Sequence, residues 1–311
     1  MLSIVSHIRK LRGGSQPHLM QVSDGSYYVV KLQGNPQGTK VLANELLASR
    51  IAERIGLPVP RAEIVYLPEE IAAEINFETP EGKLPVCSGI HCGLRIVICP
   101  LKGRMYEVLP SSELRKIRNR TDLVGAELFD FWTRNLDQRQ QIYWRRCAEK
   151  KFSVCFIDNG HCFGGPEWKF DRTAHPFHLT EFDEQRLREW IKRIEGVRRA
   201  ELSMLAAEIP AEWYGNDSHA LNSMLDELFA QSSLLQVVAQ TLGWAKHSFF
   251  PIDSNTIGGK ESIAAGSLQI SGYDDQYGTA QEAAVNSRIS PIASDGVAQP
   301  AMNAMNLVRI N

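Results

Sequence analysis

The sequence predicts an α+β protein with two lobes, and the order of its local patterns is the reason. Strand-like patterns dominate roughly the first 110 residues, whereas helical patterns dominate residues 111 to about 245. A predicted hairpin interrupts the helical half. The 43% hydrophobic and 23% charged content over 311 residues is ordinary for a globular chain. We therefore expect a β-rich lobe over 1–110 and a mainly helical lobe over 111–245.

The β-rich half contains a hairpin and then a helix. Strands are expected over 20–22 and 27–32, because β-forming residues flank Asp24-Gly25, a hairpin-turn signal. Over 42–55, Leu and Ile recur every three or four residues, which predicts an amphipathic helix. Gly56 and the prolines after it should end that helix. Further strands are expected over 62–67 and 94–98.

The second half is expected to hold helices around a second hairpin. An apolar stripe over 117–131 predicts the first helix, and the apolar runs 142–144 and 151–157 predict the hairpin. Long helices should follow over 183–207 and 218–240. Residues 246–311 are rich in Ser, Gly, Ala, Asn, Gln and Asp, a composition typical of a disordered, low-complexity tail.

The charge balance limits the classes of partner. Thirty-four Lys and Arg face 36 Asp and Glu, so the net charge is −2, and no overall field attracts nucleic acid or anionic lipid. The basic residues over 186–199 alternate with Glu, which is typical of a solvated helix face. The chain shows no membrane span and no signal peptide, and six scattered cysteines are read as reduced thiols. We expect a cytoplasmic protein with neither a membrane nor a nucleic-acid partner.

Five polar features suggest a phosphate site when they are taken together. Gly13-Gly14-Ser15 precedes the first predicted hairpin, and successive backbone N–H groups in such a turn bind anions. Lys31 lies on the following strand, and Glu45 on the next helix is a suitable partner for it. Asp137 and Asp158 lie at opposite ends of the second hairpin, where one would orient a hydroxyl and the other would hold magnesium.

The same features, in this order, make the chain resemble the HipA-like kinase domain family, bacterial kinases distantly similar to phosphatidylinositol kinases. The resemblance extends over about residues 10 to 240. It is carried by the segments Gly14–Leu19, Tyr28–Lys31, Asn44-Glu45, Gly56–Pro60, Trp132–Asp137, Phe156–Phe163 and Ile209–Trp213.

The resemblance implies a two-lobed protein-kinase-like fold that binds ATP and Mg²⁺ between its lobes. Lys31 would contact the phosphates and Glu45 would steady it. The phosphates would be covered by Gly13, Gly14 and Ser15. Asp137, with Arg139, would be catalytic, Asp158 would be the metal ligand, and the segment that holds adenine would lie near residues 98–104.

One position departs from the family pattern. The family's catalytic loop places a magnesium-binding Asn five residues after the catalytic Asp, and this chain has Ile142 there, which has no oxygen to offer. Either Gln140 or Gln141 replaces it through a shifted loop, or one metal ligand suffices, or the chain is a pseudokinase. The expected function is an ATP-dependent kinase acting on a Ser or Thr hydroxyl of a protein. The alternative is a nucleotide-dependent protein-binding module without turnover.

Overall fold

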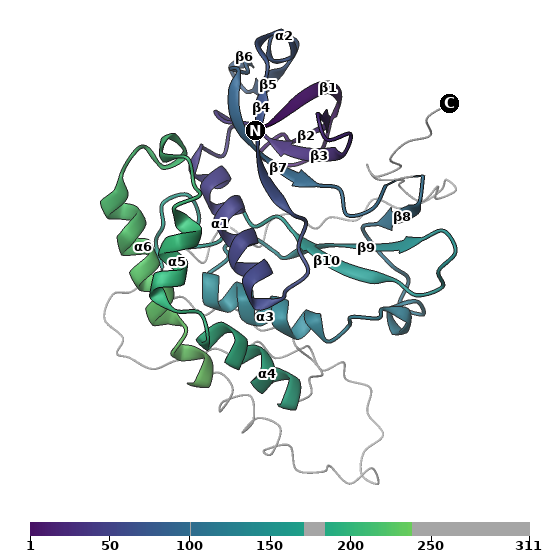
Figure 1. Ribbon diagram of the computed structural model, residues 1–311, viewed down its shortest axis with the longest axis vertical. Helices are drawn as coiled ribbons and strands as arrows, with labels where there is room; N and C mark the ends of the chain where they lie inside the picture. Colours follow the sequence, from purple (N-terminus) through teal and green to yellow (C-terminus); the bar gives the residue numbers. More distant parts are fainter. Residues whose placement is uncertain (100, 171–183, 238–311) are drawn as a thin grey trace, which may run out of the picture.

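The computed structural model describes residues 1–99, 101–170 and 184–237. The tail predicted over 246–311 lies outside the described residues. The helix predicted over 218–240 is too long, because it ends at Gln231 and a turn follows; residues 238–240 lie outside the described residues. A β-rich body and a helical body lie one above the other, with a small sheet beside them (Figure 1). The structure therefore has the two-lobed α+β architecture that the sequence predicts.

Five strands close a small barrel in the first lobe. They are β1 (Leu2–Lys10), β2 (His18–Val22), β3 (Tyr27–Lys31), β7 (Gly89–Arg95) and β4 (Ala62–Leu67), in that spatial order. The predicted hairpin is β2–β3, with Tyr28 paired to Met20. The sequence patterns did not predict β1, which pairs antiparallel with β2 and parallel with β4 and so closes the barrel.

A long helix joins the barrel to the second lobe. It is α1 (Lys40–Ile55), and it ends at Gly56, which takes a left-handed φ of 80° and donates its N–H to the last turn. This confirms the helix and the stop that the sequence predicts. The barrel also carries the short helix α2 (Glu69–Ala72) and the hairpin of β5 (Asn76–Thr79) and β6 (Gly82–Pro85).

A three-stranded sheet with strand order β10-β9-β8 lies at the junction of the lobes. Its strands are β8 (Gly103–Tyr106), β9 (Gln140–Arg146) and β10 (Ser153–Ile157). The β9–β10 pair is the second predicted hairpin. The strand predicted over 94–98 is wrong in its bounds: β7 begins at Gly89 and ends at Arg95, and the chain then leaves the barrel to reach β8.

The second lobe is helical. A short 3-10 helix (Leu114–Lys116) precedes α3 (Asp122–Thr133), and a second one (Ala211–Tyr214) separates the later helices. These later helices are α4 (Glu184–Glu195), α5 (Arg199–Ala206) and α6 (Ser218–Gln231). The single helix predicted over 183–207 is wrong: Arg198 adopts an extended conformation that separates α4 from α5.

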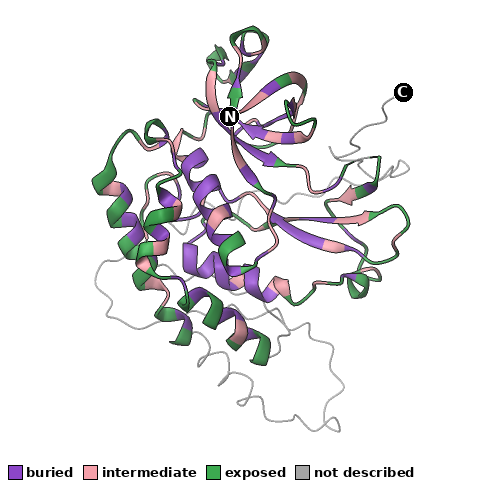
Figure 2. Ribbon diagram, viewed as in Figure 1, coloured by how far each residue is buried: buried purple, intermediate pink, exposed green. Residues whose placement is uncertain are grey.

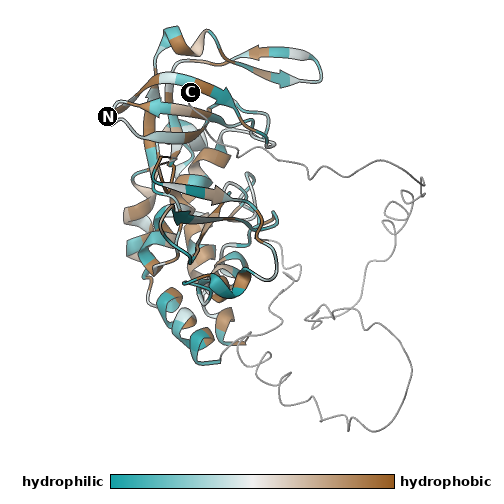
Figure 3. Cartoon of the chain, turned by 90° about the vertical axis from the view of Figure 1, so that its right-hand side faces the viewer, coloured by the Kyte–Doolittle hydropathy of each residue, from teal (hydrophilic) through white to brown (hydrophobic). Residues whose placement is uncertain are grey.

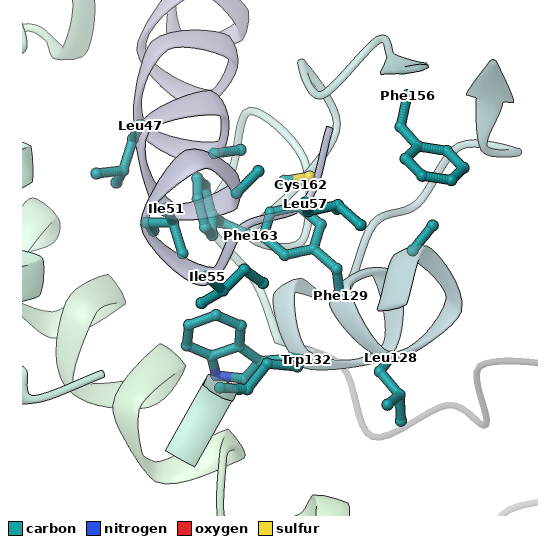
Figure 4. Close-up of a cluster of buried hydrophobic side chains, with 14 of the residues drawn as sticks. Leu47, Ile51, Ile55, Leu57, Leu128, Phe129, Trp132, Phe156, Cys162 and Phe163 are labelled. Atoms are coloured by element: carbon teal, nitrogen blue, oxygen red, sulfur yellow. The ribbon is translucent and has the colours of Figure 1, made fainter. Parts of the chain in front are cut away.

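The main hydrophobic core lies where α1 meets α3 and the segment after β10. Buried residues concentrate on the inner faces of these elements (Figure 2). Figure 4 shows this cluster, which includes Leu47, Ile51, Ile55, Leu128, Phe129, Trp132, Phe156 and Phe163. Because α1 packs on both lobes, its side chains are held rigidly at the junction. Within the described ranges, no helix has the length and apolar character needed to cross a bilayer.

Candidate active site

A pocket of about 440 Å³ lies between the barrel and the β8–β9–β10 sheet. The apolar side chains of its lining include Val29, Leu94, Ile96, Val97, Met105 and Ile142, and we call this part of the lining the apolar end. The glycines and polar residues of its lining include Gly13, Gly14, Ser15, Lys31, Asp137, Arg139, Gln140 and Asp158, and we call this part the polar end. The pocket suits a ligand with a flat apolar part and an anionic part.

Lys31 bridges two carboxylates at the polar end. Its Nζ lies 2.6 Å from Glu45 Oε2 and 2.7 Å from Asp158 Oδ1. The side chains of Lys31 and Glu45 are 6% and 0% exposed, whereas that of Asp158 is 27% exposed. These three residues come from β3, α1 and the end of β10, so the fold unites the charged residues that the sequence placed far apart.

The ion pairs determine the charge state of this cluster. Burial alone would lower the pKa of Lys31, but the carboxylates of Glu45 and Asp158 outweigh burial and raise it. Burial acts to raise the pKa of Asp158, but Lys31 outweighs that effect and the net shift is downward. Lys31 and Asp158 are therefore both charged at neutral pH, which leaves a cation next to an anion at the pocket.

The backbone after β10 is shaped to bring Asp158 to Lys31. Asp158 has a φ of 64°, a left-handed conformation that non-glycine residues seldom adopt. A Cβ on Gly160 would lie 2.6 Å from Val41 Cγ1 and 3.2 Å from Lys31 Nζ, so only glycine fits there. Such local strain is typical of functional sites.

The glycine turn contributes to the lining of the pocket. Gly13, Gly14 and Ser15 form part of the connection between β1 and β2. Gly13 has a φ of 144°, which favours glycine. A Cβ on Gly14 would lie 2.6 Å from Gln37 Nε2, so the turn approaches the loop before α1 closely.

Asp137 and Arg139 occupy one loop but differ in environment. Asp137 is exposed at the pocket. Arg139 points inward, where its guanidinium makes a double ion pair with buried Asp130 of α3 and donates to Asn159 Oδ1 at 2.6 Å. Burial acts to lower the pKa of Arg139, but Asp130 outweighs it and raises the pKa. Arg139 therefore anchors the loop that carries Asp137 to the segment that carries Asp158.

Gln140 takes the position beside Asp158. Its Nε2 donates to Asp158 Oδ2 at 2.8 Å, and its backbone pairs with Ile157. Ile142, two residues further along β9, is 4% exposed and lines the apolar part of the pocket. The amide side chain next to Asp158 is thus three residues after Asp137, not five.

Asn44 is a site residue whose role the sequence patterns did not reveal. Its Nδ2 donates to the carbonyls of Gly160, Cys162 and Gly165 at 3.0, 3.0 and 3.1 Å, and its Oδ1 accepts from Trp168 Nε1 at 2.7 Å. The segment after Asp158 is thereby fixed to α1. The sequence did contain a signal for this role, because Asn44 is a polar residue at a core-facing position of a predicted helix. Asp130, which lies between two phenylalanines, gave the same signal.

The donor set fits a magnesium–nucleotide complex, not a closed metal site. Among the described residues there is no group of three or more His, Cys, Asp and Glu side chains that could hold a metal ion. Asp158 offers carboxylate oxygens, and the Gln140 amide, whose nitrogen faces Asp158, carries one more oxygen. Mg²⁺ prefers one or two carboxylates completed by water and substrate phosphates, so these two residues suit it.

Comparisons with known proteins show the family and the fold of the chain. The family model described as HipA-like kinase matches residues 4–247. No curated protein sequence matches the chain. The crystal structure of the Helicobacter pylori proinflammatory kinase CtkA has a TM-score of 0.51 and 12% identity, covering 76% of this chain and 96% of CtkA.

Two other solved structures are similar at lower scores. Hydra Fam20 has a TM-score of 0.44 and 12% identity, over 79% of this chain and 86% of Fam20. HipA of Shewanella oneidensis MR-1, in a structure with HipB and operator DNA, has 0.45 and 12%, over 76% of this chain and 67% of the HipA structure's chain. The fold is protein-kinase-like. Because the family model spans most of its length, the chain belongs to the HipA-like kinase family.

Proposed function

We propose that this protein transfers the γ-phosphoryl group of ATP, with Mg²⁺, to a Ser or Thr hydroxyl of a protein. The observation that carries the proposal is the Lys31–Glu45–Asp158 cluster at the polar end of a pocket whose other end is apolar. A nucleobase matches the apolar end. Phosphoryl transfer relies on positioned cations around a triphosphate, which matches the polar end.

Each residue has a distinct task in the proposed reaction. Asp137 accepts the proton of the acceptor hydroxyl as its oxygen attacks the γ-phosphorus. The bond from that phosphorus to the bridging oxygen breaks, and ADP leaves. Lys31 neutralises phosphate charge, and Glu45 keeps Lys31 in position. Arg139 acts through Asp130 and Asn159 to position Asp137.

Asp158 and Gln140 would hold the metal ion. Magnesium would supply neutralisation of charge on the phosphates when it is bound. Gln140 supports an active enzyme, because its side-chain amide lies beside Asp158 and has an oxygen that can bind the metal ion, whereas Ile142 has none. The amide would rotate so that its oxygen, in place of its nitrogen, faces the ion.

Labelled ATP tests the proposed transfer. The full chain with ATP and Mg²⁺ should label itself or an added protein, and phosphoamino-acid analysis should return phosphoserine or phosphothreonine. Asp137→Ala should abolish labelling, whereas Gln138→Ala, next to it and also exposed, should leave it nearly unchanged. Equal labelling by wild type and Asp137→Ala would contradict the proposal.

Ile142 is the one observation that favours the pseudokinase alternative, and experiment can distinguish that alternative from an active kinase. A pseudokinase would be stabilised by ATP in a thermal shift assay without producing ADP. If the enzyme is active and uses Gln140, the Gln140→Ala variant should lose most of the turnover. The Ile142→Asn variant should have no higher turnover than the wild type, since Ile142 lines the apolar end. Turnover that rises in Ile142→Asn would show that the missing ligand belongs at that position.

A further inference from the structure

Two neighbouring segments expose side chains on both faces of the β8–β9 pair, and we treat these side chains as one surface. The segments are residues 101–118 and 144–153, and backbone hydrogen bonds hold them side by side: Cys147 N–H to Lys102 O at 3.1 Å, and Phe152 N–H to Lys116 O at 3.0 Å. The surface covers the outer ends of β8 and β9, which face the viewer in the hydrophilic centre of Figure 3.

This surface concentrates positive charge. The two segments contain nine Lys and Arg against three Glu, a local charge of +6 in a chain whose net charge is −2. Eight of these nine basic residues are exposed, and two of the eight, Lys116 and Arg118, pair with glutamates. The other six form what we call the basic surface: Lys102, Arg104, Arg115, Arg146, Lys150 and Lys151.

The described residues, 1–99, 101–170 and 184–237, do not neutralise the basic surface. Two of the three glutamates are already engaged, Glu113 with Lys116 and Glu149 with Arg118. Within the described part of the chain, none of the six side chains of the basic surface has a carboxylate within ion-pair distance. Helix α4 differs, because Arg186 and Arg188 each pair with a glutamate of the same helix. The solvated face predicted for α4 is confirmed, and the basic surface needs another explanation.

We propose that the basic surface binds an acidic polypeptide that also carries aliphatic side chains. Complementary charge favours an anionic partner. Leu101 and Leu114, 80% and 37% exposed, are next to Lys102 and Arg115 in the sequence. An exposed leucine side chain gains nothing from contact with a phosphate group, but it can pack against an aliphatic side chain. The aromatic residues of the two segments, Tyr106, Trp144 and Phe152, are half-buried or buried, so no exposed ring is available to stack with bases. A polypeptide therefore fits better than a nucleic acid.

Fluorescence anisotropy with the full chain tests this proposal. The probe is a labelled peptide of Glu in which Leu recurs every few residues. We expect binding that weakens as NaCl is raised, and at least about a tenfold loss of affinity in the triple variant Arg104→Glu, Arg146→Glu, Lys150→Glu. The matched control, Arg186→Glu, Arg188→Glu, Lys192→Glu in α4, changes the net charge equally and should keep the affinity within about twofold.

Two further measurements make the result decisive. The double variant Leu101→Ser, Leu114→Ser leaves every charge in place. It should weaken binding of the Glu–Leu peptide and leave binding of an all-Glu peptide unchanged. This variant tests the proposal even if the triple variant does not fold. Equal loss in both triple variants would overturn the proposal, because net charge alone would then explain binding. Tighter binding of duplex DNA than of a peptide with the same charge would also overturn the proposal, because the partner would then be a nucleic acid.

Discussion

At the scale of single residues, Asn44 holds the segment after β10 by four hydrogen bonds from one buried side chain. Asn44→Ala leaves buried carbonyls without a donor, so we expect a loss of about 1–3 kcal/mol in the free energy of unfolding. Asn44 holds Gly160, which is two residues after Asp158, so its loss should shift Asp158. We therefore also expect kcat to fall at least about tenfold.

Urea unfolding and steady-state kinetics measure the two effects of Asn44→Ala. Ser49→Ala is the matched control on the same helix, since Ser49 Oγ accepts one bond from Asn159, at 3.3 Å. It should change both quantities much less. A folded Asn44→Ala variant with the wild-type kcat would show that Asn44 stabilises the fold without positioning the site.

Two buried histidines of the barrel predict acid sensitivity. Burial lowers the pKa of His18 and of His91 from 6.5 to about 4, with His7 and Lys10 adding to the shift at His18. Unfolding therefore takes up protons as the pH falls from about 6.5 to 4, and the free energy of unfolding falls through that window. Each histidine contributes a slope of up to about 1.4 kcal/mol per pH unit.

Urea unfolding at several pH values checks the histidine prediction. His18→Leu cannot titrate and should show a shallower loss of stability below pH 6.5. His219→Leu changes a histidine that is exposed in the folded state and should retain the full slope. Identical slopes in wild type and His18→Leu would mean that His18 does not contribute.

At the scale of elements, the contact between α3 and α4 depends on one glycine. A Cβ on Gly125 would lie 2.4 to 2.6 Å from ring carbons of Trp190. Alanine favours a helix by about 1 kcal/mol over glycine, but the overlap should cost about 1–3 kcal/mol, so Gly125→Ala should destabilise the protein. Adding Trp190→Leu should make Gly125→Ala less harmful, and a double-mutant cycle by thermal unfolding measures this coupling. Additive effects would refute the packing explanation.

At the scale of the whole molecule, Lys31 and its two carboxylates join the barrel, α1 and the β9–β10 hairpin. Lys31→Met leaves Glu45 buried beside Asp158 without a cation, and breaking such a buried pair costs about 3–5 kcal/mol. Adding Asp158→Asn removes one of the two facing charges and should restore part of that loss. Urea unfolding of the single and double variants measures it. A double variant less stable than Lys31→Met would contradict this account.

Local signals predicted a good part of this architecture. The β2–β3 and β9–β10 hairpins, α1 and its end at Gly56 follow from residues adjacent in sequence, because turn preference and helical periodicity are local properties. The break between α4 and α5 was missed because an amphipathic pattern continues through Arg198. Strand β1 was missed because its place depends on partners in β2 and β4 that are distant along the chain.

The sequence by itself determined the candidates for the chemistry: Lys31, Glu45, Asp137 and Asp158 are recognisable by type and order. Only the tertiary structure decided what each one faces. It turned Arg139 towards Asp130, placed Gln140 beside Asp158 and put Ile142 against the apolar end of the pocket. The physical reason is that a side chain's environment is set by packing between elements, and spacing along one segment contains no information about which distant element lies opposite.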